Sequence, residues 1–240
     1  MMSLPHKKLV SLIAIGLVSA SLSGAQAVAS DNVFFDDFES STPPLVGVWS
    51  DRSLNITPDD DRHFLGQFSG NEAATLFWNN LSAHDSIDLS FDLFIIRDWD
   101  GDEVYAANDT PDQWQLTFDG RTLVSQSFSN NINPQSYPVA PSLTQTGAVE
   151  TGTLGYFYPG HGRSDAVYHF EFSEPHTADS LLIEFSGIDV GALGEESWGI
   201  DNVMVSFVPE PSSMSLLVIG LGAMMTHRRR NNRRRRGTRL

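Results

Sequence analysis

Alternation of apolar and polar residues dominates the middle of the chain, and helical periodicity is nearly missing there. Residues 87–93, Ile-Asp-Leu-Ser-Phe-Asp-Leu, alternate strictly, so the four apolar side chains share one face and the Asp, Ser and Asp side chains share the other. This is the pattern of a half-buried strand. We expect about nine strands of this kind, at residues 33–38, 63–68, 73–78, 87–93, 113–118, 122–128, 166–172, 181–185 and 200–207.

Turn residues separate these strands. Asp119-Gly120 lies between two of them and predicts a hairpin, because both central residues of a type I′ turn need a positive φ. About nine short strands with Gly, Asn, Asp and Pro between them indicate an all-β fold, a two-sheet antiparallel sandwich of the jelly-roll kind. We expect residues 30–208 to form it as one domain. Two long loops stand out, at 98–112 and 130–152.

Residues 1–29 predict a secretory signal peptide. Lys7 and Lys8 precede the apolar run 9–22, and small residues at 25–29 place a signal peptidase site near Ala27 or Ala29. We therefore expect an N-terminal signal helix that signal peptidase removes. A retained membrane anchor is the alternative.

The C-terminal segment has three ordered parts. Pro209-Glu210-Pro211 precedes an uncharged run, 212–226, and eight of the thirteen residues 228–240 are arginine. A dense cationic cluster stays on the cytoplasmic side of a membrane, so this order predicts a transmembrane helix at 212–227 with the domain 30–208 on the far side. The span is short, since 15 residues rise about 23 Å against a hydrocarbon core of about 30 Å. A buried helix with a basic tail is the alternative.

This order of parts, 209–240, resembles the PEP-CTERM sorting signal of Gram-negative bacteria, with Pro209, Glu210 and Pro211 as the sorting motif. The resemblance implies an exosortase as a partner, which cuts near the motif. The protein would then pass from an inner-membrane intermediate to the cell surface, the outer membrane or the exterior. Segments 64–68 (Phe-Leu-Gly-Gln-Phe) and 196–203 (Glu-Ser-Trp-Gly-Ile-Asp-Asn-Val) look like those of secreted, mostly uncharacterised bacterial jelly-roll proteins. That likeness implies a fold and a location, and no activity.

The exported region is far more acidic than the whole chain. Residues 31–208 hold 29 Asp and Glu, five Arg and no Lys, a net charge of −24 against −15 for the chain. Such a field repels nucleic acid and anionic polysaccharide unless cations intervene, so we expect no nucleic-acid partner. The chain has no cysteine, so no disulfide supports the fold.

Two groups of carboxylates are candidate calcium ligands. Asp98, Asp100 and Asp102 alternate around Gly101, and Asp112 follows in the same loop, which offers the hard oxygen ligands that calcium takes. A solvated acidic loop is the alternative.

The second group, Glu39 and Asp201, is implied by resemblance alone. Carbohydrate-binding jelly rolls hold a structural calcium where the first and last strands pair, and these two residues fall at such strands. The alternative for Asp201 is a turn cap that accepts from backbone amides.

Trp99, in the acidic loop, is the candidate platform for a sugar ring, whereas Trp78, Trp114 and Trp198 are expected in the core. No catalytic motif is recognisable in the sequence, and we expect no enzyme. The sequence thus predicts an exported surface or matrix protein with a structural, adhesive or glycan-binding role, in contact with extracellular polysaccharide. The alternative is a secreted polysaccharide-acting hydrolase.

Overall fold

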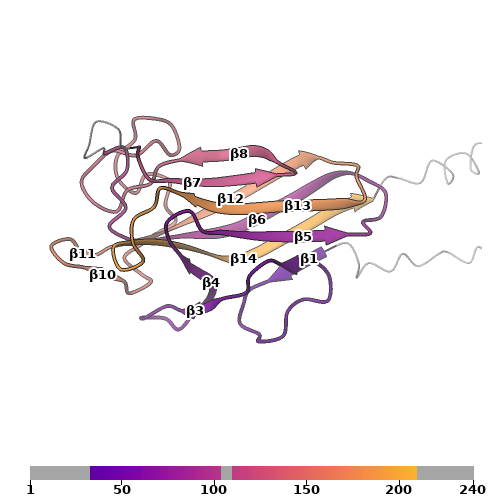
Figure 1. Ribbon diagram of the computed structural model, residues 1–240, viewed down its shortest axis with the longest axis horizontal. Helices are drawn as coiled ribbons and strands as arrows, with labels where there is room; N and C mark the ends of the chain where they lie inside the picture. The colour runs from indigo at the N-terminus through magenta and orange to yellow at the C-terminus, as the bar shows by residue number, and fades with distance from the viewer. Residues whose placement is uncertain (1–32, 104–109, 210–240) are drawn as a thin grey trace, which may run out of the picture.

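The computed structural model describes residues 33–103 and 110–209. Within them the chain forms fourteen strands and no helix, and all strand pairs are antiparallel. Two main sheets lie face to face (Figure 1), so the predicted all-β antiparallel sandwich is confirmed for this part of the chain. The expected signal helix, the helix at 212–227, the tail 228–240, Glu210 and Pro211 lie outside the described residues. In the described part no helix is long and apolar enough to span a membrane.

The larger sheet has seven strands in the order β3-β4-β14-β6-β12-β9, and β1 also pairs with β14. Its strands are β1 (Val33–Asp36), β3 (Leu54–Ile56), β4 (His63–Phe68), β6 (His84–Arg97), β9 (Glu150–Thr151), β12 (Asp165–Pro175) and β14 (Glu196–Pro209).

The smaller sheet has five strands in the order β2-β5-β13-β7-β8, and β10 and β11 form a separate two-stranded hairpin. The strands are β2 (Val48–Trp49), β5 (Ala73–Asn79), β7 (Gln113–Phe118), β8 (Arg121–Gln126), β10 (Phe157–Tyr158), β11 (Gly162–Arg163) and β13 (Ser180–Ile188).

All nine expected strands are present, and five short strands join them. Asp119 and Gly120 have φ values of 48° and 75°, which confirms the predicted turn between β7 and β8. The strand expected at 87–93 extends to Arg97, beyond the end of the alternation. Phe94 and Ile96 are buried on the outer face of β6, in a second apolar cluster with Leu154 and Tyr156 from a covering loop.

The core lies between the sheets and is rich in aromatic rings. Phe91 of β6 meets Phe185 of β13 edge to face at 5.1 Å, and Phe170 of β12 stacks on Trp114 of β7 at 5.7 Å. Trp78, Trp114 and Trp198 are all buried, as expected. The core therefore holds the sandwich together through ring contacts and without a disulfide.

The long loop 130–152 is ordered by one buried amide. Gln135 is fully buried: its Oε1 accepts from the amides of Ser129 and Gln145, and its Nε2 donates to the carbonyls of Tyr137 and Thr146. A side chain thus satisfies backbone groups that a strand ladder would otherwise pair. These bonds connect residues 129, 135, 137, 145 and 146, and so hold together a segment that has no strand periodicity.

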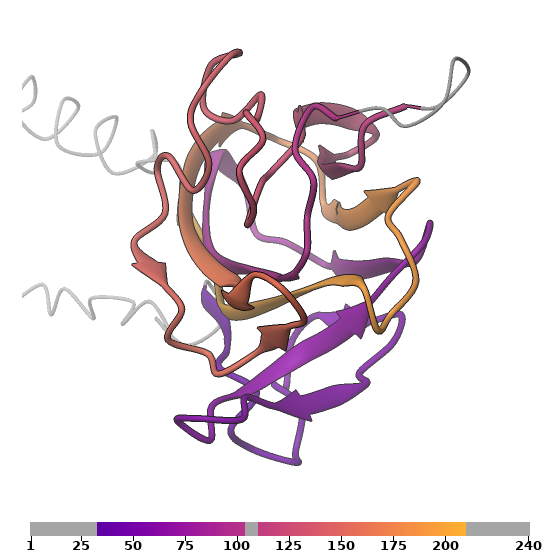
Figure 2. The same ribbon diagram turned by 90° about the vertical axis from the view of Figure 1, so that its left-hand side faces the viewer.

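The first and last described residues lie at one end of the larger sheet. Val33 pairs with Ser206, and Pro209 lies opposite His84, the first residue of β6. β14 ends at Pro209, beyond the expected strand end at 207, so the first residue of the predicted sorting motif belongs to the last strand. Loops gather at the opposite end, which faces the viewer in Figure 2.

Candidate binding sites

The loop after β6 lines an acidic pocket of about 410 Å³ at the loop end of the sandwich. A second segment, between β13 and β14, supplies the rest of its carboxylates. The two segments are far apart in the sequence, and the fold brings them together because β6 and β14 are neighbours. The acidic lining residues are Asp98, Asp100, Glu103, Asp112, Asp189, Glu195 and Glu196.

Three of the four predicted loop ligands line this pocket. Asp98 is hydrogen-bonded to Nδ1 of His161, and Asp100 accepts a hydrogen bond from Asn131. Asp112 also lines it. Asp102 does not, because its carboxylate accepts from the hydroxyl of Ser127 and holds the loop to the segment after β8.

Glu196, at the start of β14, is a pocket residue that the sequence did not reveal. It is 5% exposed, and its Oε2 accepts from the amide of Gly191 at 2.7 Å. Burial, together with the hydrogen bond and the negative charge of Asp112, raises the pKa of Glu196 to about 9. Glu196 therefore keeps its proton near neutral pH. Adjacent Glu195 and Glu196 before a strand were the available signal, but no motif links them to the distant loop.

The described carboxylates do not form a ready calcium shell. Calcium takes six to eight oxygen ligands, and the described residues contain no group of three His, Asp or Glu side chains spaced to hold a metal ion. Calcium at the acidic pocket therefore stays a prediction.

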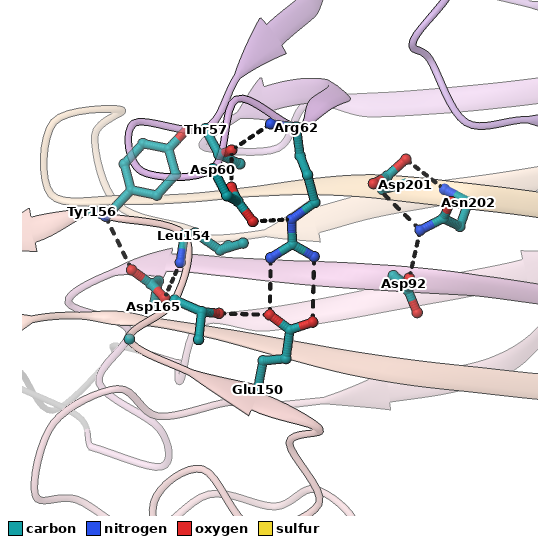
Figure 3. Close-up of polar contacts among 12 residues, drawn as sticks. Thr57, Asp60, Arg62, Asp92, Glu150, Leu154, Tyr156, Asp165, Asp201 and Asn202 are labelled. Carbon is teal, nitrogen blue, oxygen red and sulfur yellow. Dashed lines mark hydrogen bonds and ion pairs between the residues drawn. The ribbon is translucent and has the colours of Figure 1, made fainter.

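Of the second predicted pair, Asp201 lies on β14 of the larger sheet, and Glu39 follows β1, which pairs with β14. Asp201 is 3% exposed, and its Oδ1 accepts from the amide of Asn202 at 2.7 Å, while Asn202 Nδ2 donates to Asp92 at 2.8 Å (Figure 3). Burial, aided by the charges of Asp92 and Glu39, raises the pKa of Asp201 to about 7. Asn202 has a φ of 52° at a shift in the β14 register, so Asp201 bonds to a backbone amide at an irregular point of the strand, as in the turn-capping alternative.

Glu39 has a partner of its own. Its carboxylate accepts from the amide of His63 at 3.0 Å and lies 2.7 Å from His63 Nδ1, and these bonds lower the pKa of Glu39. Its charge acts on Asp201, so the fold brings the two predicted ligands into one neighbourhood. Among the described contacts, no hydrogen bond joins the two carboxylates, and calcium at this pair stays a prediction.

Trp99 is fully buried, so its interpretation as an exposed sugar platform is wrong. Its Nε1 donates to the carbonyl of Ser197 at 2.8 Å, and its ring meets Phe128 edge to face. Trp99 lies near the start of the acidic loop in the sequence. In the structure its indole packs into the core, while the neighbouring residues Asp98 and Asp100 line the pocket.

The five arginines of residues 31–208 all have partners. Arg62 joins the β3–β4 hairpin to β9 through Asp60 at 2.6 Å and Glu150 at 2.9 Å (Figure 3). Arg97 donates to Gln67, Leu193 and Ser197 and lies over the ring of Tyr156. The others form ion pairs: Arg52 with Asp36, Arg121 with Glu174, and Arg163 with Asp59. These guanidinium groups are therefore already hydrogen-bonded or ion-paired within the domain and offer little attraction to an anionic ligand.

A less charged groove of about 440 Å³ opens between β8 and β12, along one side of the sandwich. Tyr137, Phe172, Gln126 and His169 are among its lining residues. No sequence pattern predicted this groove, because its walls come from opposite sheets.

No protein-family model and no curated protein matches the chain. Among solved structures, dimeric latent PorU from Porphyromonas gingivalis is 11% identical, with a TM-score of 0.39 over 77% of this chain; the chain spans 13% of PorU. A family 35 carbohydrate-binding module from Clostridium thermocellum is 11% identical, with a TM-score of 0.35 over 74% of this chain and 99% of the module. The C-terminal CBM6 of LamC from Zobellia galactanivorans is 10% identical, with a TM-score of 0.33 over 73% and 99%. These similarities concern the general sandwich architecture alone.

Proposed function

We propose that the protein is exported to the cell surface or the extracellular matrix, where its β-sandwich binds a polysaccharide in a structural or adhesive role. The observation that carries this proposal is the placement of the chain ends. Val33 and Pro209 lie at one end of the larger sheet, and the acidic pocket and long loops lie at the other. The 14 residues of β6 separate these ends by about 45 Å. A domain held through residues 209–240 would present its loops outward.

The sorting route rests on the two terminal segments. Signal peptidase would remove residues 1–29, and an exosortase would act near Pro209, Glu210 and Pro211 while residues 212–227 hold the chain in the inner membrane. Since β14 ends at Pro209, a cut after the tripeptide leaves the last strand whole. The sandwich would then remain folded after release to the surface, the outer membrane or the medium.

Location tests the sorting proposal. Replacing Pro209, Glu210 and Pro211 together by alanine should leave the domain folded but keep the protein in the inner membrane with its arginine tail. The wild type should appear in the outer or extracellular fraction without the tail and without residues 1–29, as intact-mass analysis would show. Equal release of both proteins would contradict the sorting role.

A glycan array with and without calcium tests the binding role. We expect retention of at least one polysaccharide without turnover. A structural calcium would stabilise the domain and strengthen binding. If no polysaccharide is retained under either condition, the binding proposal is wrong.

A secreted polysaccharide-acting hydrolase is the second candidate, and the pair Glu196 and Asp112 favours it. Glu196 keeps its proton near neutral pH and could act as a general acid, and the second carboxyl group of the pair, Asp112, could act as a general base. Turnover on a polysaccharide panel that Glu196→Gln abolishes would establish the hydrolase. Binding without turnover supports the first proposal.

A further inference from the structure

The two sheets leave one side of the sandwich open, between β8 and β12. Among the described strands β8 pairs with β7 alone, and β12 pairs with β6 along its length but with β9 only at Ala166 and Val167. The free edges of these two strands border the groove of about 440 Å³, and Tyr137 and Pro138 from the long loop line it as well. A ligand could thus contact both sheets at once.

The aromatic lining of the groove is built in layers. The rings of Phe170 and Phe172 lie 6.0 Å apart and 8° from parallel, and the ring of Tyr137 lies 5.3 Å from Phe170. Phe170 is buried, whereas Tyr137 and Phe172 are partly exposed. Exposed ring faces offer the apolar surface on which the C–H face of a sugar ring packs.

The polar lining offers both donors and acceptors. Ser125 Oγ bonds to Gln113, and Gln126 Nε2 lies 3.5 Å from the carbonyl of Pro138. Hydroxyl, amide, imidazole and carboxylate groups together match the donor and acceptor pattern of sugar hydroxyls. His169 and Glu171 complete this lining.

His169 is held in a defined orientation. Its Nδ1 bonds to Asp92 at 2.7 Å, and its Nε2 lies 3.5 Å from Glu171. The bond to Asp92 raises the pKa of His169. The carboxylates of Asp92 and Glu171 lie beside the ring, so this site offers an anionic ligand little net attraction.

The charge of the surroundings selects against an anionic ligand. The exported region carries a net charge of −24, and Arg121, at the start of β8, is paired with Glu174. An uncharged polysaccharide escapes the repulsion that a polyuronate or a nucleic acid would meet here.

A strand from another protein is the competing occupant. The pairing of β8 with β7 shifts register between Leu116 and Thr117, and such bulges twist an edge strand away from further pairing. Aromatic faces with hydroxyl and amide groups beside them suit a sugar chain better than a regular strand ladder.

We propose that the groove between β8 and β12 binds a neutral glycan chain, with Tyr137 and Phe172 as stacking surfaces and Gln126 as a hydrogen-bonding partner. This inference rests on the polysaccharide-binding function proposed above and names its site and ligand class.

The test uses the mature protein and two tryptophan substitutions on one strand. Ser125→Trp adds a ring at a residue that lines the groove, and Thr122→Trp, also exposed on β8 but outside the groove lining, is the matched control. Affinity for soluble neutral glucans, galactans and mannans is measured by calorimetry, with a polyuronate as the anionic comparison. We expect Ser125→Trp to bind the preferred neutral glycan at least about tenfold more weakly, and Thr122→Trp to bind it like the wild type.

Tyr137→Ala and Gln126→Ala give a second line of evidence, each read beside its melting temperature. We expect both to weaken glycan binding, and Gln126→Ala to do so with an unchanged melting temperature.

Each contrary outcome has a distinct meaning. If the wild type binds a neutral glycan and all four variants bind it equally, the groove is the wrong site and the proposed function stands. If no glycan binds to the wild type, the proposed function fails with it. Preference for the polyuronate overturns the ligand class. A dimer that Ser125→Trp dissociates, without glycan binding, would identify a second copy of the chain as the occupant and overturn the inference.

Discussion

Glu196 and Asp201 lie five residues apart on β14, and the difference between their surroundings separates two kinds of buried carboxylate. Glu196 lies in the acidic pocket with Asp112 as its hydrogen-bond partner, and its pKa rises to about 9. Asp201 accepts from the amide of Asn202, with Asp92 and Glu39 acting through their charge, and its pKa rises to about 7. Burial raises both values, and a backbone amide offsets each rise, that of Gly191 for Glu196 and that of Asn202 for Asp201. The hydrogen bond with the carboxyl group of Asp112 adds to the rise at Glu196 alone.

The two regions also differ in how they are assembled. The acidic pocket joins a loop that begins at Asp98 to a segment that ends at Glu196. The Asp201 cluster is built largely on paired strands, because Asp201 lies opposite Asp92 across the β14–β6 pair. The pocket should therefore be the more sensitive of the two to changes in loop packing and ions.

The largest expected effect comes from Trp99, which anchors the pocket loop in the core. Trp99→Ala removes a fully buried indole and should cost about 3–5 kcal/mol of unfolding free energy. We expect the pocket loop to lose protection in hydrogen exchange while the amide of Asn202 keeps its own. Trp99→Phe, which keeps a ring but loses the bond to Ser197, should cost less. A loss below about 1 kcal/mol for Trp99→Ala would contradict this role.

The second-largest expected effect is stabilisation by calcium, which should differ between the acidic pocket and the Asp201 cluster. A hundredfold excess over Kd contributes about 2.7 kcal/mol, which raises the melting temperature of a domain of about 180 residues by roughly 5–10 °C. We expect Asp100→Asn with Asp112→Asn to abolish this rise, as measured by calorimetry with calcium and with chelator.

Asp201→Asn is the matched variant at the other region. If it alone abolishes the calcium effect, the ion binds beside Asp201 and Glu39. Equal melting temperatures of the wild type with calcium, magnesium and chelator would show that both predicted calcium sites are wrong.

The pH dependence of stability without calcium should distinguish the two carboxylates. Both pKa values are raised in the folded state, so the stability that each proton contributes is complete below about pH 4 and is lost as the pH rises, through about 7 for Asp201 and about 9 for Glu196. Asp201→Asn should remove roughly 1–3 kcal/mol of the wild-type loss between pH 4 and 7. Glu196→Gln should remove a loss that continues to pH 9. Urea unfolding near pH 5, 7 and 9 in chelator measures this, and parallel profiles for wild type and variants would refute it.

The smallest expected effect belongs to Glu39. It is half exposed and bonded to His63, so Glu39→Gln should change the unfolding free energy by less than about 1 kcal/mol. Because its charge helps to raise the pKa of Asp201, the substitution should lower that pKa slightly, as carboxyl NMR titration would show. An increase in the pKa of Asp201 would contradict the charge interaction.

Strands were predictable because their signal is local. The apolar and polar alternation at 87–93 places every second side chain in the core whatever the partner strand is, and Asp119-Gly120 defines its turn through backbone conformation alone. The part of β6 that departs from alternation, at Phe94 and Ile96, is buried on its outer face by a loop from more than fifty residues away. No local pattern contains that contact.

The candidate sites depended on tertiary structure to different degrees. The acidic character of the loop after β6 was evident from the sequence, because it follows directly from the number of Asp and Glu residues in that segment. Its completion by Glu196, the burial of Trp99 and the groove beside Tyr137 were not, because each depends on which distant segments the two sheets bring together. By itself the sequence determined the strands, the turn and the sign of the field around the domain, since these follow from neighbouring residues and summed charge. Only the tertiary structure decided which carboxylates are buried and which aromatic rings stay exposed to solvent, because burial depends on how distant segments pack together.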